Sequence, residues 1–202
     1  MIRRRRALAL PVAVLAVATF GLSGCSDAGE TPAAPSVATP EYSGDHATGD
    51  HNQADVDFAT MMFANRLQVV QLIGLAQSKS QNEDVKGAAT DLSDDQAGEI
   101  ADLGGWLDGW GVQAANIKPA DHAGMAGVLA AKDVTALEGL NGAAFDKAWV
   151  GKIIESLKGS LTAAQDEQKK GKNGEALSFA NDVVERQGGT ISDLTELLGQ
   201  LP

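Results

Sequence analysis

Few side chains in this chain of 202 residues can bind a metal or act as nucleophiles. The sequence holds one cysteine, three histidines and four methionines. Met61 and Met62 are adjacent, His122 and Met125 are three residues apart, and His51 precedes a helical pattern. Imidazole and thioether groups can bind metal ions, so these five residues are candidate metal ligands. The alternative is structural, because methionines at helical spacing usually fill a core and loop histidines are usually solvated.

Motifs for catalysis are missing from the sequence. It contains no Glu-x-x-His pair of the kind that holds two iron ions in helical bundles. It also contains no Gly-x-Ser-x-Gly nucleophile motif and no phosphate-binding glycine loop. We therefore expect a protein that is not an enzyme and that has no certain cofactor.

The single cysteine belongs to a predicted export signal. A basic run, Arg3 to Arg6, precedes 14 apolar residues, 7–20, and then Leu22-Ser23-Gly24-Cys25. The apolar stretch is too short to span a bilayer and is typical of a secretory signal. The last four residues resemble a bacterial lipoprotein signal, which predicts lipidation of Cys25 and removal of residues 1–24. An ordinary signal peptide followed by an unmodified cysteine is the alternative.

The predicted mature chain is strongly acidic. Removing the four arginines of residues 1–24 leaves 12 basic and 27 acidic residues, a formal charge of −15. Such a surface repels phosphate backbones, so we expect no nucleic-acid partner. Residues 25–51 are rich in Pro, Gly, Ser and Thr and predict a flexible tether behind the lipid. We expect the protein at the extracytoplasmic face of the cell membrane, held there by its lipid.

The rest of the chain, residues 52–202, is predicted to be all-α and to consist of two copies of an internal repeat. A shift of 91 residues aligns 54–110 with 145–201 and gives 12 identities in 57 positions. Helical periodicity predicts helices near 53–78 and 80–109, the second with a capping box at Ser80 to Glu83. A third helix carries an apolar stripe over 145–163, a turn follows at 169–174, and a fourth helix carries a stripe over 177–198. The two copies, 52–110 and 142–202, are joined by a connection, 111–141, with a short helix near 132–138. This pattern is typical of a ferritin-like four-helix bundle with a long central crossover.

Each predicted apolar stripe contains one polar residue near its middle. In antiparallel helices the four positions fall at similar heights, which predicts one polar layer across the core. Arg66 is expected to form an ion pair with Glu99 or Glu155 at the edge of this layer. The layer either specifies packing and register or is the remnant of a site. Its members are Asn65, Gln96, Ser156 and Gln187.

Residues 51–110 and 122–198 resemble the domain of unknown function 305 family. The matching strings are 51–62 (HNQADVDFATMM), 96–100 (QAGEI) with Trp106-Leu107, and Leu137-Glu138 leading into 142–146 (GAAFD). The resemblance implies a ferritin-like four-helix bundle that is often exported or lipid-anchored. It also implies that some relatives are linked to copper binding or copper tolerance.

The sequence departs from these relatives where metal binding is implied. The family pattern places a histidine pair after Met-Met or Met-Ile in each copy. This chain has Met61-Met62-Phe63-Ala64-Asn65-Arg66 in the first copy and Ile153-Ile154-Glu155-Ser156-Leu157 in the second, so both histidine pairs are absent. Because amide and hydroxyl groups are poor copper ligands, the core metal site is not carried over to this chain. We expect a binding or scaffolding module with an envelope protein as partner, and copper binding through the remaining His and Met residues as the alternative.

Overall fold

The computed structural model describes residues 49–202, and this part of the chain contains helices and no β-strand. The predicted all-α class is therefore confirmed. The predicted signal, residues 1–24, the lipidation residue Cys25 and the tether up to residue 48 lie outside the described residues. The long helices are α1 (Gln53–Lys79), α5 (Gly142–Lys170) and α6 (Gly174–Gln200). The shorter elements are α2 (Glu83–Asp91), α3 (Gln96–Gly109), α4 (Ala131–Gly139) and the 3-10 helices Ala114–Asn116 and Pro119–His122.

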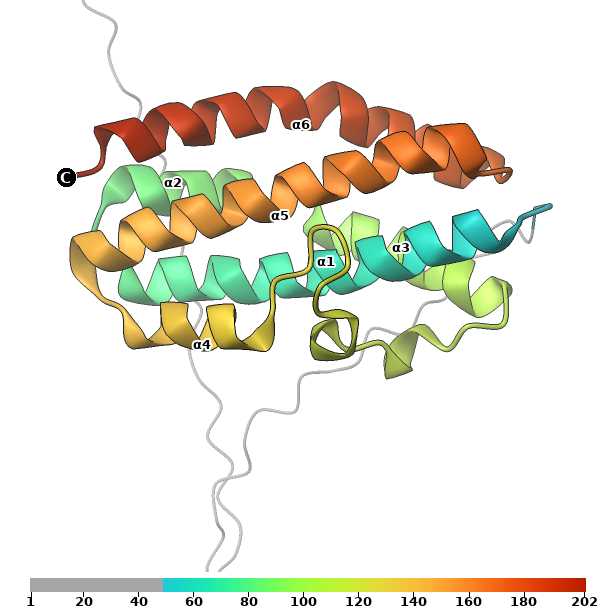
Figure 1. The fold of residues 1–202 in the computed structure, drawn as a ribbon, viewed down its shortest axis with the longest axis horizontal. Helices are drawn as coiled ribbons and strands as arrows, with labels where there is room; N and C mark the ends of the chain where they lie inside the picture. Colours follow the sequence, from blue (N-terminus) through green and yellow to red (C-terminus); the bar gives the residue numbers. More distant parts are fainter. Residues whose placement is uncertain (1–48) are drawn as a thin grey trace, which may run out of the picture. The chain divides into compact units, whose positions relative to one another are not determined.

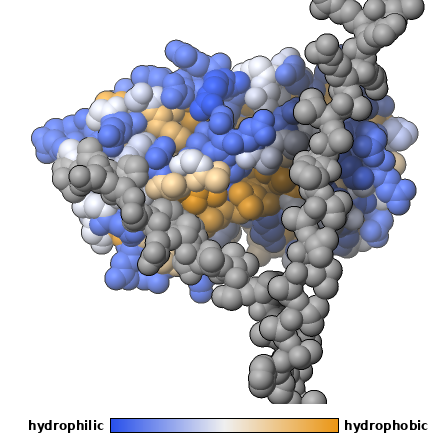
Figure 2. Space-filling model, turned by 180° about the vertical axis from the view of Figure 1, so that it is seen from behind, coloured by the Kyte–Doolittle hydropathy of each residue, from blue (hydrophilic) through white to orange (hydrophobic). Residues whose placement is uncertain are grey.

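The long helices lie side by side and form the body of the bundle (Figure 1). α5 packs against both α1 and α6, α1 also packs against α3, and α2 touches α6. Within residues 49–202, no helix combines the length and the apolar character needed to cross a bilayer. Figure 2 shows one face of the molecule on which hydrophilic residues surround an apolar area.

The single helix predicted over 80–109 is wrong, because the chain forms α2 and α3 with a turn at 92–95 between them. The turn starts where the hydroxyl of Ser93 donates to the carbonyl of Thr90 at 2.6 Å. Ser and Asp side chains compete with helical hydrogen bonds, and Asp94 and Asp95 follow directly. The positions 91 residues later, which lie inside the unbroken α6, are Val184, Glu185 and Arg186.

The predicted capping box at Ser80 is also wrong by two residues. Asn82 is the N-cap of α2, and its side chain accepts from the backbone N–H groups of Asp84 and Val85. Ser80 is the C-cap of α1, and its hydroxyl donates to Asp146 at 2.6 Å. A complete capping box occurs instead at the start of α1, between Asn52 and Asp55.

Two aspartates that are identical in the 91-residue alignment each bind the turn of the opposite helix pair. Asp55 of α1 accepts from the backbone N–H groups of Lys172 and Asn173, both at 2.8 Å, in the turn between α5 and α6. Asp146 of α5 accepts from Ser80 in the turn between α1 and α2. Both aspartates are buried, so each contact fastens one end of the bundle.

Polar side chains separate two apolar clusters along α1. One cluster gathers around Leu72, Phe145 and Trp149, and the other around Phe58 and Met62. The indole Nε1 of Trp149 donates to the carbonyl of Leu72 at 2.7 Å, so this buried donor is satisfied. Between the two clusters α1 presents three buried polar side chains, Asn65, Arg66 and Gln68.

The crossover between α3 and α5 lies directly against α5. Gly127 has a φ of +87°, and a Cβ there would stand 2.9 Å from both Ser156 O and Ser160 N. A Cβ on Gly159 would overlap the backbone of Gly127. The two glycines therefore permit a backbone contact that no other residue pair allows.

We predict that Gly159→Ala lowers the free energy of unfolding by about 2 kcal/mol, because the added methyl group pushes the crossover off α5. Gly151→Ala, on the same helix, is the control, since a Cβ there meets no atom within 4 Å. This control should stabilise the protein by up to about 1 kcal/mol through helix propensity. Urea denaturation of both variants measures the difference, and equal effects would contradict the close contact.

Candidate functional site

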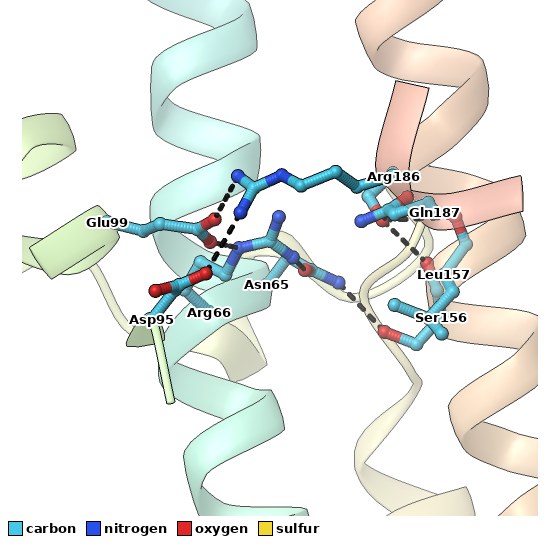
Figure 3. Close-up of polar contacts among 9 residues, drawn as sticks. Asn65, Arg66, Asp95, Glu99, Ser156, Leu157, Arg186 and Gln187 are labelled. Atoms are coloured by element: carbon cyan, nitrogen blue, oxygen red, sulfur yellow. Dashed lines mark hydrogen bonds and ion pairs between the residues drawn. The ribbon is translucent and has the colours of Figure 1, made fainter. Parts of the chain in front are cut away.

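A hydrogen-bonded centre lies where α1, α5 and the crossover meet (Figure 3). The side-chain amide of Asn65 donates to Ser156 Oγ at 2.8 Å and to the carbonyl of Gly127 at 2.6 Å. The hydroxyl of Ser156 donates to the same carbonyl at 2.9 Å. Asn65 and Ser156 are 91 residues apart, so they occupy equivalent positions in the aligned halves. The centre joins these two positions through one backbone oxygen.

The other two residues of the predicted polar layer lie differently. Gln187 contacts the hydroxyl of Ser160 through Oε1 at 3.2 Å, so α6 reaches the centre through a neighbour of Ser156. Gln96 lies at the start of α3, where its buried Oε1 has no hydrogen-bond partner among the described residues. The structure thus brings Asn65 and Ser156 together, connects Gln187 to them through Ser160, and leaves Gln96 outside the hydrogen-bonded centre.

An ion pair closes the side of the centre that faces α3. Arg66 is 3% exposed, and its Nε lies 2.5 Å from Glu99 Oε2. Its Nη1 donates to Asn65 Oδ1 at 2.9 Å, which connects the ion pair to the centre. Burial lowers the pKa of the Arg66 guanidinium, and the charge of Glu99 opposes that shift. The predicted ion pair is confirmed with Glu99, whereas Glu155 pairs with Lys152.

A second arginine extends this ion pair towards the surface. Arg186 of α6 reaches Glu99 Oε1 at 3.4 Å and Asp95 Oδ2 at 2.9 Å. Figure 3 shows the Glu99 carboxylate between the two guanidinium groups. Asp95 lies in the turn between α2 and α3, so the broken helix supplies an acceptor that joins α3 to α6.

Sequence reasoning missed the contacts that bind the crossover. Gln68 of α1 donates from Nε2 to the carbonyl of Leu129 at 3.0 Å and accepts from Leu129 N at 2.7 Å. The Gln68 side chain thereby satisfies both backbone polar groups of Leu129, as a neighbouring backbone would in regular secondary structure. Gln68 follows Asn65 by three residues on the same helix face, and this spacing is the one sequence signal that could have identified it. Gly127 acts through its backbone carbonyl, and the sequence carries no signal for that role.

The candidate copper ligands do not form one group. Met62 is fully buried in the apolar core, and the ring of His51 stacks on Trp110 with centroids 4.9 Å apart. His122 Nδ1 lies 3.3 Å from Met125 Sδ, as the three-residue spacing suggested. Met61 and Met125 line a common cavity of about 300 Å³ between α1 and α5. Among residues 49–202 no three His, Cys, Asp or Glu side chains are grouped closely enough to hold a metal ion.

A buried carboxyl pair lies at the end of the bundle where α1 begins. Glu167 is 2% exposed, and within the described residues no group makes a hydrogen bond of normal geometry to its carboxyl oxygens. Burial raises the pKa of Glu167 to about 8, and the nearby carboxylate of Asp55 adds to the rise. Burial also opposes ionisation of Asp55, but the proton of Glu167 and the backbone N–H groups that Asp55 binds outweigh it and lower its pKa. Glu167 is therefore protonated at neutral pH while Asp55 is ionised.

The fold and this centre define a class of protein, a helical bundle whose crossover is bound into a polar core. The chain belongs to the DUF305 family, "Domain of unknown function (DUF305)", whose family model matches residues 55–198. The resemblance seen in the sequence is thereby confirmed.

Two solved structures show the same fold. A DUF305 protein from Streptomyces coelicolor, proposed to be secreted, has 24% sequence identity and a TM-score of 0.64 over 73% of this chain and 93% of its own. A DUF305 fragment from Deinococcus radiodurans has 21% identity and a TM-score of 0.67 over 76% of this chain and 100% of its own. A comparison with curated proteins gives no match.

We predict that Asn65→Ala lowers the free energy of unfolding by about 3 kcal/mol, because it removes two hydrogen bonds to the centre and one to a buried guanidinium. Ser156→Ala should cost about 1 kcal/mol. In the double variant the two costs should differ from additivity by at least about 0.5 kcal/mol, since the residues share one acceptor. Urea denaturation of all four proteins measures this coupling, and strict additivity would contradict a shared centre.

The carboxyl pair predicts a pH dependence of stability. Glu167 holds its proton up to about pH 8 when folded and up to about pH 4.5 when unfolded. Its stabilising contribution is therefore complete below about pH 4.5 and is lost as the pH rises towards 8. We expect the free energy of unfolding to fall by about 2 kcal/mol or more between pH 5 and pH 8.

Glu167→Gln should remove most of this fall, because glutamine keeps the shape of the protonated acid and does not ionise. Glu185→Gln, at an exposed position on α6, is the control and should keep the slope of the unchanged protein. Urea denaturation at several pH values gives the three slopes. If Glu167→Gln retains the original slope, the raised pKa is not the cause.

Proposed function

We propose that this protein is a non-enzymatic binding or scaffolding module of the cell envelope, in which a polar centre occupies the place of the family's core metal site. The single observation that carries the proposal is the contact of Asn65 and Ser156 with the Gly127 carbonyl. The family resemblance implies histidines at these two positions. Here the residues satisfy each other and a backbone oxygen, and Arg66 places a positive charge beside them. Amide, hydroxyl and guanidinium groups make a poor site for copper.

The finer architecture belongs to the same proposal. We infer a ferritin-like bundle built from two copies of one helical hairpin, 52–110 and 142–202, with the crossover 111–141 between them. The reciprocal contacts of Asp55 and Asp146 with opposite turns support this reading, because a duplicated hairpin places equivalent residues at equivalent ends. The break between α2 and α3 is then a local change in the first copy.

The location follows from the export signal in the sequence. We propose that Cys25 carries a lipid, that residues 25–51 act as a tether, and that the bundle is held at the extracytoplasmic face of the membrane. The partner of such a module is an envelope protein, and its acidic surface disfavours nucleic acid.

Copper binding is the second candidate, and one observation favours it. Met61 and Met125 line the same cavity, and His122 touches Met125, so three soft or borderline donors lie at one place. His51 and Met62 do not join them. Two thioethers and one imidazole give an open, incomplete ligand set, which is why this candidate ranks below the scaffold.

The lipid anchor is tested by detergent phase partitioning of the protein made in a bacterial host that processes lipoproteins. The unchanged protein should enter the detergent phase, and Cys25→Ala should move it to the aqueous phase. Ser26→Ala, next to the modified residue, is the control and should partition like the unchanged protein. Unchanged partitioning of the Cys25 variant would contradict the anchor.

Titration of the mature chain with Cu(I) and Cu(II) against a competing chelator separates the two functions. The scaffold predicts no stoichiometric binding tighter than about 1 μM, equivalent to about −8 kcal/mol. Binding tighter than that, lost in Met125→Leu but kept in Met62→Leu, would favour the copper function instead. Met62→Leu is the matched control because Met62 lies in the apolar core.

A further inference from the structure

An open groove lies between α2 and the C-terminal half of α6, which are neighbours in Figure 1. Its volume is about 590 Å³, within the usual range of binding clefts. The apolar part of its lining consists of Ala88, Leu92, Leu194 and Leu197. Leu194 is buried and the other three are partly buried, so the groove has a firm apolar floor that belongs to the core.

The rim of this groove is acidic. Its charged residues are all carboxylates, Glu83, Asp84, Asp91, Asp193 and Glu196, and no Lys or Arg lines it. Lys86 reaches Glu83 from outside the groove at 3.7 Å. The other four carboxylates have no cationic partner among the described residues. An apolar floor between unpaired carboxylates is complementary to a cationic, amphipathic occupant.

The aligned half of the chain supplies a smaller counterpart of the groove, in which two aromatic rings occupy part of the space. A cavity of about 290 Å³ between α3 and the N-terminal half of α6 is lined by residues at the equivalent positions. There Trp106 replaces Leu197 and Phe179 replaces Ala88, and the two rings meet edge to face at 5.8 Å. Three of the five rim carboxylates are retained, since Asp102, Glu175 and Asp182 correspond to Asp193, Asp84 and Asp91, whereas Gly174 and Gly105 stand at the positions of Glu83 and Glu196.

The comparison of the two halves shows that the acidic rim and the open space have different causes. Both cavities have carboxylates at equivalent positions, so acidity alone does not produce the groove. The open space comes from two smaller floor residues, Ala88 and Leu197, which leave unfilled the volume that two aromatic rings occupy in the other half. The floor and the rim together favour an occupant that has an apolar face and positively charged side chains.

We propose that this groove, which we call the α2–α6 groove, binds a basic amphipathic helix of a partner protein. The proposal rests on the scaffold function and names the chemistry of its partner. α2 has nine residues and is therefore about 13 Å long, which matches two to three turns of a docked helix. Apolar residues spaced by three and four along that helix contact Leu194 and Leu197, while its Lys and Arg side chains meet the rim.

The test uses the full mature chain, with Cys25→Ala to keep the surface free of lipid. The ligand is a fluorescent helical peptide of about 15 residues, with leucines at helical spacing on one face and lysines elsewhere. Fluorescence anisotropy should show saturable binding that weakens with added salt. A peptide with glutamate in place of every lysine should not bind.

Two pairs of variants locate the binding. The double variant Ala88→Phe with Leu197→Trp copies the aromatic pair of the smaller cavity without changing the net charge and should weaken binding at least tenfold. Asp193→Asn should weaken it about threefold or more. Its matched control, Asp102→Asn at the equivalent position of the smaller cavity, should change it by less than about twofold. Circular dichroism of each variant verifies that the helices are retained.

Four results would overturn the inference. They are an absence of saturable peptide binding up to about 1 mM, equal effects of the Asp193 and Asp102 variants, unchanged binding by the Ala88→Phe/Leu197→Trp double variant, and equal binding of the glutamate peptide. Stoichiometric binding of spermine with no binding of the peptide would point to a free polyamine and also overturn it. The lipid partitioning experiment does not involve the groove, so failure of the anchor and failure of the groove remain distinguishable.

Discussion

The carbonyl oxygen of Gly127 accepts hydrogen bonds from both Asn65 and Ser156, and the arrangement of the bundle depends on this shared acceptor. One oxygen joins α1, α5 and the crossover at the level where two apolar clusters meet. The close contact of Gly127 with Gly159 makes this approach sterically possible. Because an unsatisfied carbonyl buried among helices is costly, the crossover is held in one position rather than lying loosely over the bundle.

Regular apolar patterns in the sequence predict the positions of the long helices, and the short helix α4 also lies near its predicted position. The break at Ser93 was missed because side-chain competition with the helix is weak locally and tertiary contacts decide the outcome. In the polar centre, Asn65 and Ser156 were identified from their place in apolar stripes, and Arg66 with Glu99 from their proximity in the expected bundle. Backbone groups such as the Gly127 carbonyl carry no side-chain signal, so a sequence does not reveal them.

The two halves of the chain share their polar framework and differ in what fills it. Asp55 and Asp146 bind opposite turns, but the second acceptor meets a serine hydroxyl whereas the first lies beside the protonated Glu167. The same division applies to the surface, where aromatic rings narrow one acidic cavity to about 290 Å³ and the other has about 590 Å³. The proposed duplication of a hairpin accounts for this division, because it keeps the residues that hold the bundle together and leaves surface residues free to vary.

The most direct test of the account is native-state hydrogen exchange of the Leu129 backbone amide, which donates to Gln68 beside the polar centre. If the crossover is part of the core, this amide exchanges only through global unfolding, with a free energy of opening equal to the free energy of unfolding from urea denaturation. The amide of a loop resting on the surface would exchange through a local opening of much lower free energy. That result would contradict the central claim that Gly127, Asn65 and Ser156 bind the crossover into the bundle.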